Sequence, residues 1–524
     1  MSRRTDAGTG RLSHLIQENR TRLTVLSVLL FLFLAAFGGL EREDWFSTIM
    51  QGLSVGAITF LVASGLSLIF GLMDVLNLAH GEIFMLGAYV GWTIYTRFDT
   101  ALDIAIPLLL LAAPFSLMPM WRTTASRFGP APAVHRAIGW VLLLSGGLAT
   151  WFAITRFPLV IWDAGAFAFS PGSYSTQVDL GMLAPLAADS FDGAAVVAII
   201  GLLLGGAILA LAVSFFQRTP AEVAVSPRRV GVAAGLVLLA IVLHLTKGSI
   251  NEWVFGLSTS WRFFLAMAIA VAMGAAVGAF IEVLLIRPLY DRPIYQLMLT
   301  LGVGFILIEV VREVWGRPEF TMARPALFNG TGEGCPGQGI GGFFSGCSTV
   351  EMFGARLRVY NEGFVVLVGI LVLIGVTLLL KRTRIGMIIR AGVQDPDMVE
   401  ALGINVRQVF TLVFALGSSL AALGGVLAAP SIGLSTGMGA LFLLSALIAL
   451  AIGGLTSFPG AAAGAVLVGL LQQLIIRFGQ NGIDLPFLAE PFKPTPTLVP
   501  AASVLLMVVV LLLLPAGLFG RSER

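Results

Sequence analysis

The sequence contains about fourteen apolar runs, and most of them are long enough to cross roughly 30 Å of hydrocarbon as helices. A helix satisfies its own backbone hydrogen bonds in lipid, and the runs lack the alternation of membrane barrel strands. The composition agrees, because 57% of the residues are hydrophobic and only 12% are charged. We therefore expect an all-α, polytopic membrane helix bundle of about 14 spans. The runs lie at about residues 22–40, 46–70, 83–97, 103–120, 137–155, 193–216, 229–247, 261–286, 293–314, 362–381, 407–430, 437–457, 459–478 and 498–516.

The positions of Lys and Arg predict the orientation, because connections rich in these residues stay on the cytoplasmic side. Five arginines precede residue 23 and place the N-terminus inside, whereas the acidic stretch 41–44 lies outside. Alternation from there also places the C-terminus inside. The basic or mixed connections that fall inside are 121–136, 217–229, 286–293 and 381–408. The net charge of +3 comes from such connections and gives no reason to expect nucleic acid as a partner.

The two cysteines, Cys335 and Cys347, share one Gly-rich loop on the expected outer side. Two thiols that face an oxidising compartment form either a disulfide or two reduced thiols in a loop, and the shared placement favours the disulfide. Closing that ring stabilises a protein by about 2–4 kcal/mol. Neither His nor further Cys accompanies the pair, so the loop has no zinc-ligand set, and we expect no metal site.

Motifs of enzymes and nucleotide-binding proteins are missing from the sequence. There is no GxxxxGK[ST] phosphate-binding loop, no HExxH and no GxSxG. The four histidines, at positions 14, 80, 135 and 244, are scattered singly. We therefore expect a transporter subunit rather than an enzyme, with no catalytic residue and no cofactor on this chain.

A short amphipathic helix is expected inside the polar connection 381–408. Asp395 is suited to cap it, Pro396 to open its first turn and Gly403 to end it in a left-handed conformation. Its apolar side carries Met398, Val399 and Leu402. Two interpretations stay open, namely a connector that lies on the membrane surface and a helix that docks into a groove of a soluble partner.

The stretch GLMDVLNLAHGEIFMLGAYVG, residues 71–91, places polar residues between two apolar runs. Polar groups at membrane depth are costly unless they line a cavity or pair internally, and glycines relax the helix around them. Asn77, His80, Gly81 and Glu82 therefore mark an expected helix interruption. These residues either satisfy loose backbone groups and neighbouring helices or contact a solute directly.

Several stretches together resemble the LivH-type permeases of ABC importers for branched-chain amino acids and related small solutes. They are GLSLIFGLMDVLNLAHGEIFMLGAYVG, IEVLLIRPLYDRP, RTRIGMIIRAGVQDPDMVEALGINVRQVFTLVFALGSSLAALGGVLAAP, AIGGLTSFPGAAAGAVLVGLLQ and LLLLPAGLFG. The resemblance implies a multi-pass permease subunit of the bacterial cytoplasmic (inner) membrane. It assigns Asn77, His80, Gly81 and Glu82 to the translocation path or gate, and Asp395, Pro396, Met398, Val399, Leu402 and Gly403 to the helix that couples to an ATPase.

The resemblance also implies partners: a second related permease, two ABC ATPase subunits that carry the ATP and Mg, an extracytoplasmic solute-binding protein and membrane lipid. Branched-chain amino acids come first as the small-molecule solute, and urea or short amides second. A secondary transporter, which needs ion-coupling residues inside the membrane, and a channel, which needs no ATP, are the other classes.

The expected organisation has four parts. Residues 1–45 form a cytoplasmic leader with an extra span, and residues 46–99 form the first part of the permease core. Residues 100–260 are an insertion of about four spans, relative to a family pattern that lacks it. Residues 261–524 complete the core and include the coupling connection 381–408.

Overall fold

The computed structural model describes most of the chain after residue 39. The described residues are 40–127, 132–154, 194–216, 226–290, 292–316, 319, 321–394, 396–483 and 490–520, with three isolated positions before residue 40. Nearly all of the extra span expected at 22–40 therefore lies outside them. The chain divides into two compact units, one formed by Met1–Gly91 with Ala266–Arg524 and the other by Trp92–Leu265. The second unit overlaps the insertion expected at 100–260.

The described helices match the expected apolar runs from residue 42 onward. Ten of them are long and apolar enough to cross a membrane, and the shorter helices Met438–Gly453 and Leu498–Leu513 are also apolar. The prediction of an all-α, polytopic membrane protein is thus confirmed. The apolar helices, long and short, are α3 (Arg42–Met73), α4 (His80–Thr96), α5 (Phe98–Ser116), α7 (Pro132–Ile154), α10 (Ala194–Phe216), α11 (Pro227–Gly256), α12 (Thr259–Ile281), α13 (Pro293–Trp315), α14 (Val366–Arg382), α17 (Val406–Ile432), α18 (Met438–Gly453), α19 (Phe458–Asn481) and α20 (Leu498–Leu513).

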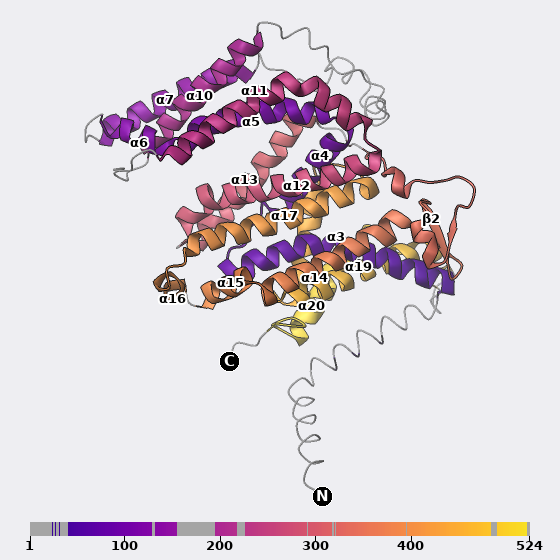
Figure 1. The fold of residues 1–524 in the computed structure, drawn as a ribbon. Helices are drawn as coiled ribbons and strands as arrows, with labels where there is room; N and C mark the ends of the chain where they lie inside the picture. Colours follow the sequence, from indigo (N-terminus) through magenta and orange to yellow (C-terminus); the bar gives the residue numbers. More distant parts are fainter. Residues whose placement is uncertain are drawn as a thin grey trace, which may run out of the picture. The chain divides into compact units, whose positions relative to one another are not determined.

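Helix α3 lies in the middle of the first unit and packs against α17 and α19 (Figure 1). Small residues allow this packing, since a β-carbon on Gly56 would lie 3.0 Å from the Cα of Val466 in α19. On the other side of α3, a β-carbon on Gly417 of α17 would lie 2.8 Å from the carbonyl oxygen of Gly65. Membrane helices associate through such small residues because lipid supplies no hydrophobic drive between them.

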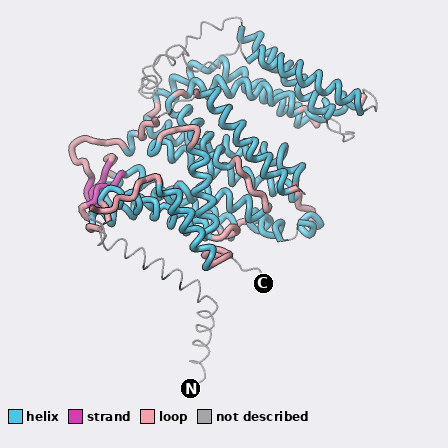
Figure 2. The backbone as a smooth tube through the Cα atoms, turned by 180° about the vertical axis from the view of Figure 1, so that it is seen from behind, coloured by secondary structure: helices cyan, strands magenta, loops and turns pink. Residues whose placement is uncertain are grey.

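A small extramembrane structure fills the loop after α13, where the sequence suggested only a Gly-rich connection. Its sheet has the order β1 (Gly337–Gln338), β2 (Thr349–Met352) and β3 (Ala355–Arg358), with β1 parallel and β3 antiparallel to β2. Figure 2 shows the strands together at one end of the helices. The short helices around the sheet are η4 (Ala326–Phe328) and η5 (Ile340–Phe344), and the π-helix η6 (Val359–Val365) leads into α14.

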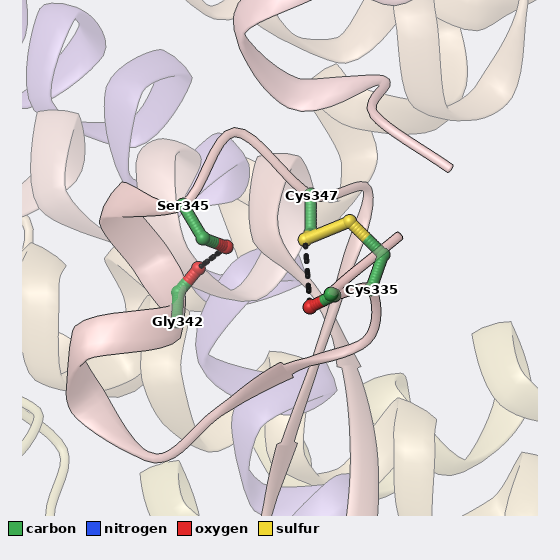
Figure 3. Close-up of a disulfide and its surroundings, with 5 residues drawn as sticks. Cys335, Gly342, Ser345 and Cys347 are labelled. Atoms are coloured by element: carbon green, nitrogen blue, oxygen red, sulfur yellow. Dashed lines mark hydrogen bonds between the residues drawn. A yellow bond between two sulfur atoms is a disulfide. The ribbon is translucent and has the colours of Figure 1, made fainter. Parts of the chain in front are cut away.

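Cys335 and Cys347 are joined as a disulfide in this loop, with their Cα atoms 5.6 Å apart. The Ser345 hydroxyl donates to the carbonyl oxygen of Gly342 at 2.7 Å (Figure 3). The disulfide closes the segment that contains η5 and brings its ends beside β1 and β2. The sheet lies at one end of α14, and the short helices α15 (Arg384–Gln394) and α16 (Pro396–Ala401) follow its other end (Figure 1).

The second unit contains α5, α7, α10 and α11 together with the short helix α6 (Met118–Ser126). Its core is apolar, and among the described residues Ile106, Leu110 and Leu202 are fully buried there. One ion pair joins two of its helices, between Lys247 of α11 and Asp103 of α5.

Candidate functional site

The polar stretch is an interruption between α3 and α4. Helix α3 ends at Met73, and Asp74 adopts a left-handed conformation (φ 53°) while its N–H donates to the carbonyl of Phe70. Asp74 is exposed, and its place at the end of α3 is that of a C-cap residue. Helix α4 does not begin until His80. Residues 74–79 therefore leave backbone groups that no helix satisfies.

Two side chains take up backbone groups of this interruption. The Asn77 side chain is fully buried, and its Oδ1 accepts a hydrogen bond from the N–H of Ala79 at 3.1 Å. The N–H of Leu78 donates to the hydroxyl of Thr300 in α13 at 3.2 Å. Sequence analysis missed Thr300. The sign that the sequence offered was that Gln296 and Thr300 are polar residues one turn apart in an apolar run.

His80 joins α4 to α3. Its side chain is fully buried, and Nε2 lies 3.2 Å from the carbonyl oxygen of Val62. A carbonyl only accepts, so Nε2 carries the proton in this contact and Nδ1 is left as an acceptor. Nδ1 has no hydrogen-bond partner within the described structure. Gly65 provides the room for the ring, because a β-carbon there would lie 2.7 Å from Nε2.

Glu82 faces different helices from those that His80 contacts. A β-carbon on Gly439 of α18 would lie 2.5 Å from Glu82 Oε2, and one on Gly304 of α13 would lie 3.4 Å from its Cγ. Gly81 packs on the same helix α18, against Leu443. The carboxylate is 6% exposed, and its Oε2 has no hydrogen-bond partner among the described residues.

The interruption thus gathers polar atoms whose hydrogen-bonding capacity is not used. Asn77 Nδ2, His80 Nδ1 and Glu82 Oε2 are all buried without a partner in the part of the chain that the structure describes. A buried polar group without a partner costs free energy of about 1–3 kcal/mol. Unpartnered polar residues between apolar helices are typical of transport pathways and gates. The described residues contain no group of His, Cys, Asp and Glu suited to hold a metal ion.

The expected cytoplasmic helix is α16, and its apolar residues divide between two sides. Met398 and Leu402 are 61% and 70% exposed, whereas Val399 is only 3% exposed and packs inward. Asp395 lies outside the described residues, and only the backbone of Pro396 is described. The exposed apolar surface therefore consists of Met398 in α16 and Leu402, which follows the last residue of that helix, rather than all three residues.

The end of α16 is held firmly to the start of α17. Gly403 adopts a left-handed conformation (φ 81°) and donates to the carbonyl of Glu400, and Ile404 donates to the carbonyl of Val399. This pair of bonds is a Schellman motif. Asn405 then caps α17, since its side chain accepts from the N–H of Gln408. The short connection is therefore bonded back to α16 on one side and caps α17 on the other.

Comparisons with known proteins assign the chain to a family. The chain matches the family described as "Branched-chain amino acid transport system / permease component" over residues 48–124 and 223–515. The unmatched residues 125–222 lie inside the insertion expected at 100–260. No solved structure matches the chain.

Among similar proteins is the high-affinity branched-chain amino acid transport system permease protein LivH of Salmonella typhimurium, 29% identical over 277 residues, which cover 51% of this chain and 78% of that protein. The permease BraD of Pseudomonas aeruginosa, named for the same transport system, is 32% identical over 31% of this chain and 49% of its own length. The galactose/methyl galactoside import permease protein MglC of Escherichia coli is 27% identical over 52% of this chain and 74% of its own length.

The matched segments cover more than half of the chain and include both the α3–α4 interruption and α16. They show that this multi-pass membrane protein belongs to the branched-chain amino acid transport permease family, whose members are the non-enzymatic transmembrane subunits of ABC importers and work with ATPase and solute-binding partners.

Proposed function

We propose that this chain forms half of the translocation path of an ATP-driven importer in a bacterial inner membrane, for branched-chain amino acids or related small polar solutes. It crosses the membrane about fourteen times, counting the runs of its sequence. A second related permease supplies the other half, two ABC ATPase subunits bind on the cytoplasmic side, and an extracytoplasmic protein delivers the solute.

The observation that carries the proposal is the α3–α4 interruption with its unpartnered polar atoms. His80 fixes the start of α4 to α3 through Val62, while Glu82 lies between α18 and α13. A change in the position of α4 relative to these helices changes which groups can meet Asn77 Nδ2, His80 Nδ1 and Glu82 Oε2. The interruption is therefore suited to act as a gate with two sets of hydrogen bonds.

The solute follows from the relatives rather than from the gate. LivH and BraD are named for branched-chain amino acids, which supports that class first. Galactose, named for MglC, and urea or short amides are the alternatives. The unpartnered atoms at the interruption are polar, so they do not distinguish one apolar side chain from another. Ranking among solutes then belongs to the binding protein.

Two variants test the gate in vesicles that contain the whole importer and its binding protein. We expect His80→Ala and Glu82→Gln each to reduce uptake of labelled leucine at least tenfold. The first removes the Nε2 contact with Val62 that positions α4, and the second replaces a carboxylate oxygen of the gate with an amide that donates instead of accepting. The competition order of isoleucine, valine, urea and galactose against leucine should stay unchanged. Asp74→Asn is the matched control, since Asp74 is an exposed acid in the same interruption and Asn tolerates the left-handed conformation.

The outcomes separate the possibilities clearly. Normal uptake in both variants contradicts the gate. A changed order of competitors in either variant makes the polar cluster a recognition site. If the wild-type importer takes up urea or galactose but not leucine, the solute assignment is wrong and the gate is tested with that solute instead.

A further inference from the structure

A second buried polar cluster lies far along the sequence from the interruption, at the end of α12. Glu282 is fully buried, and its carboxylate accepts four hydrogen bonds. Oε1 accepts from Arg287 Nε at 3.1 Å and from the Tyr290 hydroxyl at 2.5 Å. Oε2 accepts from Arg287 Nη2 at 2.9 Å and from the Thr411 hydroxyl at 2.7 Å. These four donors use the hydrogen-bonding capacity of the buried carboxylate, so Glu282 and its donors are fixed relative to one another.

A π-helical turn creates this cluster. Helix α12 gives way at Glu282 to the π-helix η2 (Glu282–Ile286), in which the N–H of Arg287 donates to the carbonyl of Glu282. Five residues of a regular α-helix turn through about 500°, which would point Glu282 and Arg287 roughly 140° apart. The wider π-turn closes at the fifth residue instead and stacks the two side chains. Such turns occur frequently at functional positions.

The cluster ties the turn after α12 to the beginning of α17. Thr411 lies in the second turn of α17, where its hydroxyl accepts from Arg287 Nη2 at 2.7 Å. Its one proton lies within reach of Glu282 Oε2 at 2.7 Å and of the Arg407 carbonyl of its own helix at 2.9 Å, and the shorter contact is the one to Glu282. The ring of Tyr290 packs edge-on against Phe410 of the same helix, with centroids 5.7 Å apart. Burial, and next the hydrogen bond to Glu282, raise the pKa of Tyr290, so its hydroxyl remains a donor. The hydroxyls of Tyr290 and Thr411 therefore both remain protonated and can donate to Glu282.

The same helix α17 begins just after α16. Only four residues, Leu402 to Asn405, separate α16 from α17. Gly403 and Ile404 are bonded back to α16 and Asn405 caps α17, so the short connection passes a displacement of α16 to the first turn of α17. Further along, α12 and α17 touch closely, because a β-carbon on Gly278 would lie 2.9 Å from the carbonyl oxygen of Phe414. Thr411 stands between α16 and this tight contact.

On its other side the cluster continues into α13. The 3₁₀ turn η3 (Arg287–Leu289) presents the carbonyl of Leu289, which accepts from Gln296 Nε2 at 2.6 Å. Gln296 is buried in the first turn of α13, one turn before Thr300. Thr300 in turn accepts from Leu78 in the interruption, and Gly304 of the same helix lies beside Glu82. An unbroken series of contacts therefore links α16 to the interruption.

We propose that Glu282 is a positioning residue for transport: with Arg287, Tyr290 and Thr411 it fastens α17 to the turn before α13, so that movement of α16 is carried to the α3–α4 interruption. The inference rests on the proposed function, because it supposes that a partner ATPase moves α16. Glu282 itself does not touch the solute. Its role is to hold α17 and the turn before α13 together. Thr411 is the member of the cluster whose hydrogen bonds can be removed with the smallest change in side-chain shape.

Thr411→Val removes the hydroxyl from this link and keeps the shape of the side chain. Thr411→Ser restores the hydroxyl and is the conservative rescue. Thr48→Val is the matched control, because Thr48 is a buried threonine whose hydroxyl donates only to Asp44 of its own helix at 2.6 Å. Each variant is made in a chain that also carries Leu76→Cys, at a half-buried position inside the interruption. The two native cysteines are joined to each other and do not compete for a maleimide.

The measurement is the rate of maleimide labelling of that cysteine in the purified importer complex, without nucleotide and after trapping with ATP and vanadate. We expect trapping to change the rate several-fold in the chain with Thr411, in Thr411→Ser and in Thr48→Val. In Thr411→Val the rate should no longer respond to trapping, although the ATPase remains bound and hydrolyses ATP.

Two failures are distinguishable. A chain with Thr411 whose labelling ignores ATP and vanadate contradicts the proposed ATP-driven function. A Thr411→Val chain that responds as fully as the control overturns the inference about Glu282 alone. Glu282→Gln provides a second test, since it keeps the size of the side chain and removes the charge that holds Arg287; a normal response in that variant also overturns the inference.

Discussion

Gly65 of α3 lies directly against the imidazole of His80, so that a β-carbon at Gly65 would be 2.7 Å from Nε2 and 2.8 Å from Cε1 of the ring. The histidine cannot retreat easily, because it is fully buried and its Nε2 is bonded to the carbonyl of Val62. The fit between α3 and α4 therefore depends on one missing side chain.

Gly65→Ala should destabilise the protein. Overpacking a filled site costs about 1–3 kcal/mol. The new β-carbon would press on His80 of α4 and on the carbonyl oxygen of Gly417 in α17, so the gate should lose uptake as these helices shift. Thermal unfolding in detergent, followed by intrinsic fluorescence, should show a lower midpoint. Gly302→Ala in α13 is the control, because no atom lies within 4 Å of a β-carbon there. An unchanged midpoint for Gly65→Ala would show that the helices shift to admit the methyl group without a loss of stability, which would contradict this prediction.

The exposed side chains of α16 should carry the contact with the ATPase. Burial of a large apolar side chain contributes about 1.5–3 kcal/mol, so replacing both Met398 and Leu402 with Arg should release the ATPase during purification. Phe344→Arg is the control: Phe344 is 89% exposed in the outer loop, and its replacement should leave the ATPase bound. If the double variant retains the ATPase and hydrolysis is still stimulated by solute, α16 is only a connector and does not carry this contact.

The disulfide should stabilise the outer loop. Closing a ring of this size contributes about 3 kcal/mol, so Cys335→Ser with Cys347→Ser should increase hydrogen exchange in β2 and β3. Mass spectrometry after alkylation without reductant should find neither native thiol modified, and after reduction it should find both. Alkylation of both cysteines before reduction would mean that the ring is open in the mature protein.

Both termini should lie on the side of α16. The hairpin of β2 and β3 lies at the start of α3, where a β-carbon on Gly354 would meet Glu43, and the turn after α18 lies near its end, with Thr456 3.4 Å from a β-carbon on Gly71. The last described residues pair with that turn, as the N–H of Leu518 donates to the carbonyl of Ile452 at 2.9 Å.

Single cysteines test this topology in intact cells with an impermeant maleimide. Ser2→Cys and Ser522→Cys, both outside the described residues, should be protected, whereas Thr331→Cys in the outer loop should react. Reaction at only one terminus would require an odd number of spans.

The sequence alone predicted those parts of the fold that depend on local chemistry. Apolar runs located the helices, and Gly403 and Asn77 marked the end of α16 and the interruption because turns and caps need particular residues. The outer sheet was missed, since its strands are two to four residues long and show no clear alternation.

The candidate site depended on distant partners, which sequence patterns do not reveal. Thr300 is 222 residues from Leu78, and Thr411 is 129 residues from Glu282. The sequence also did not predict that the Val399 side chain is buried, or that Glu282 stacks on Arg287. The first depends on packing, and the second depends on a π-turn that regular helix geometry does not anticipate.

The outer end of α3 is held by several independent contacts. Asp44 forms an ion pair with Arg477 of α19, and its carboxylate accepts from Nδ2 of Asn481 in the same helix at 2.9 Å. The ring of Phe46 packs edge-on against that of Phe353 in the outer hairpin, with centroids 5.1 Å apart. The other end of α3 stops at the interruption. These contacts oppose sliding of α3 along its axis, and the packing of Gly56 and Gly65 opposes its tilting. Helix α3 is then the fixed reference against which a shift of α4 at the interruption takes place.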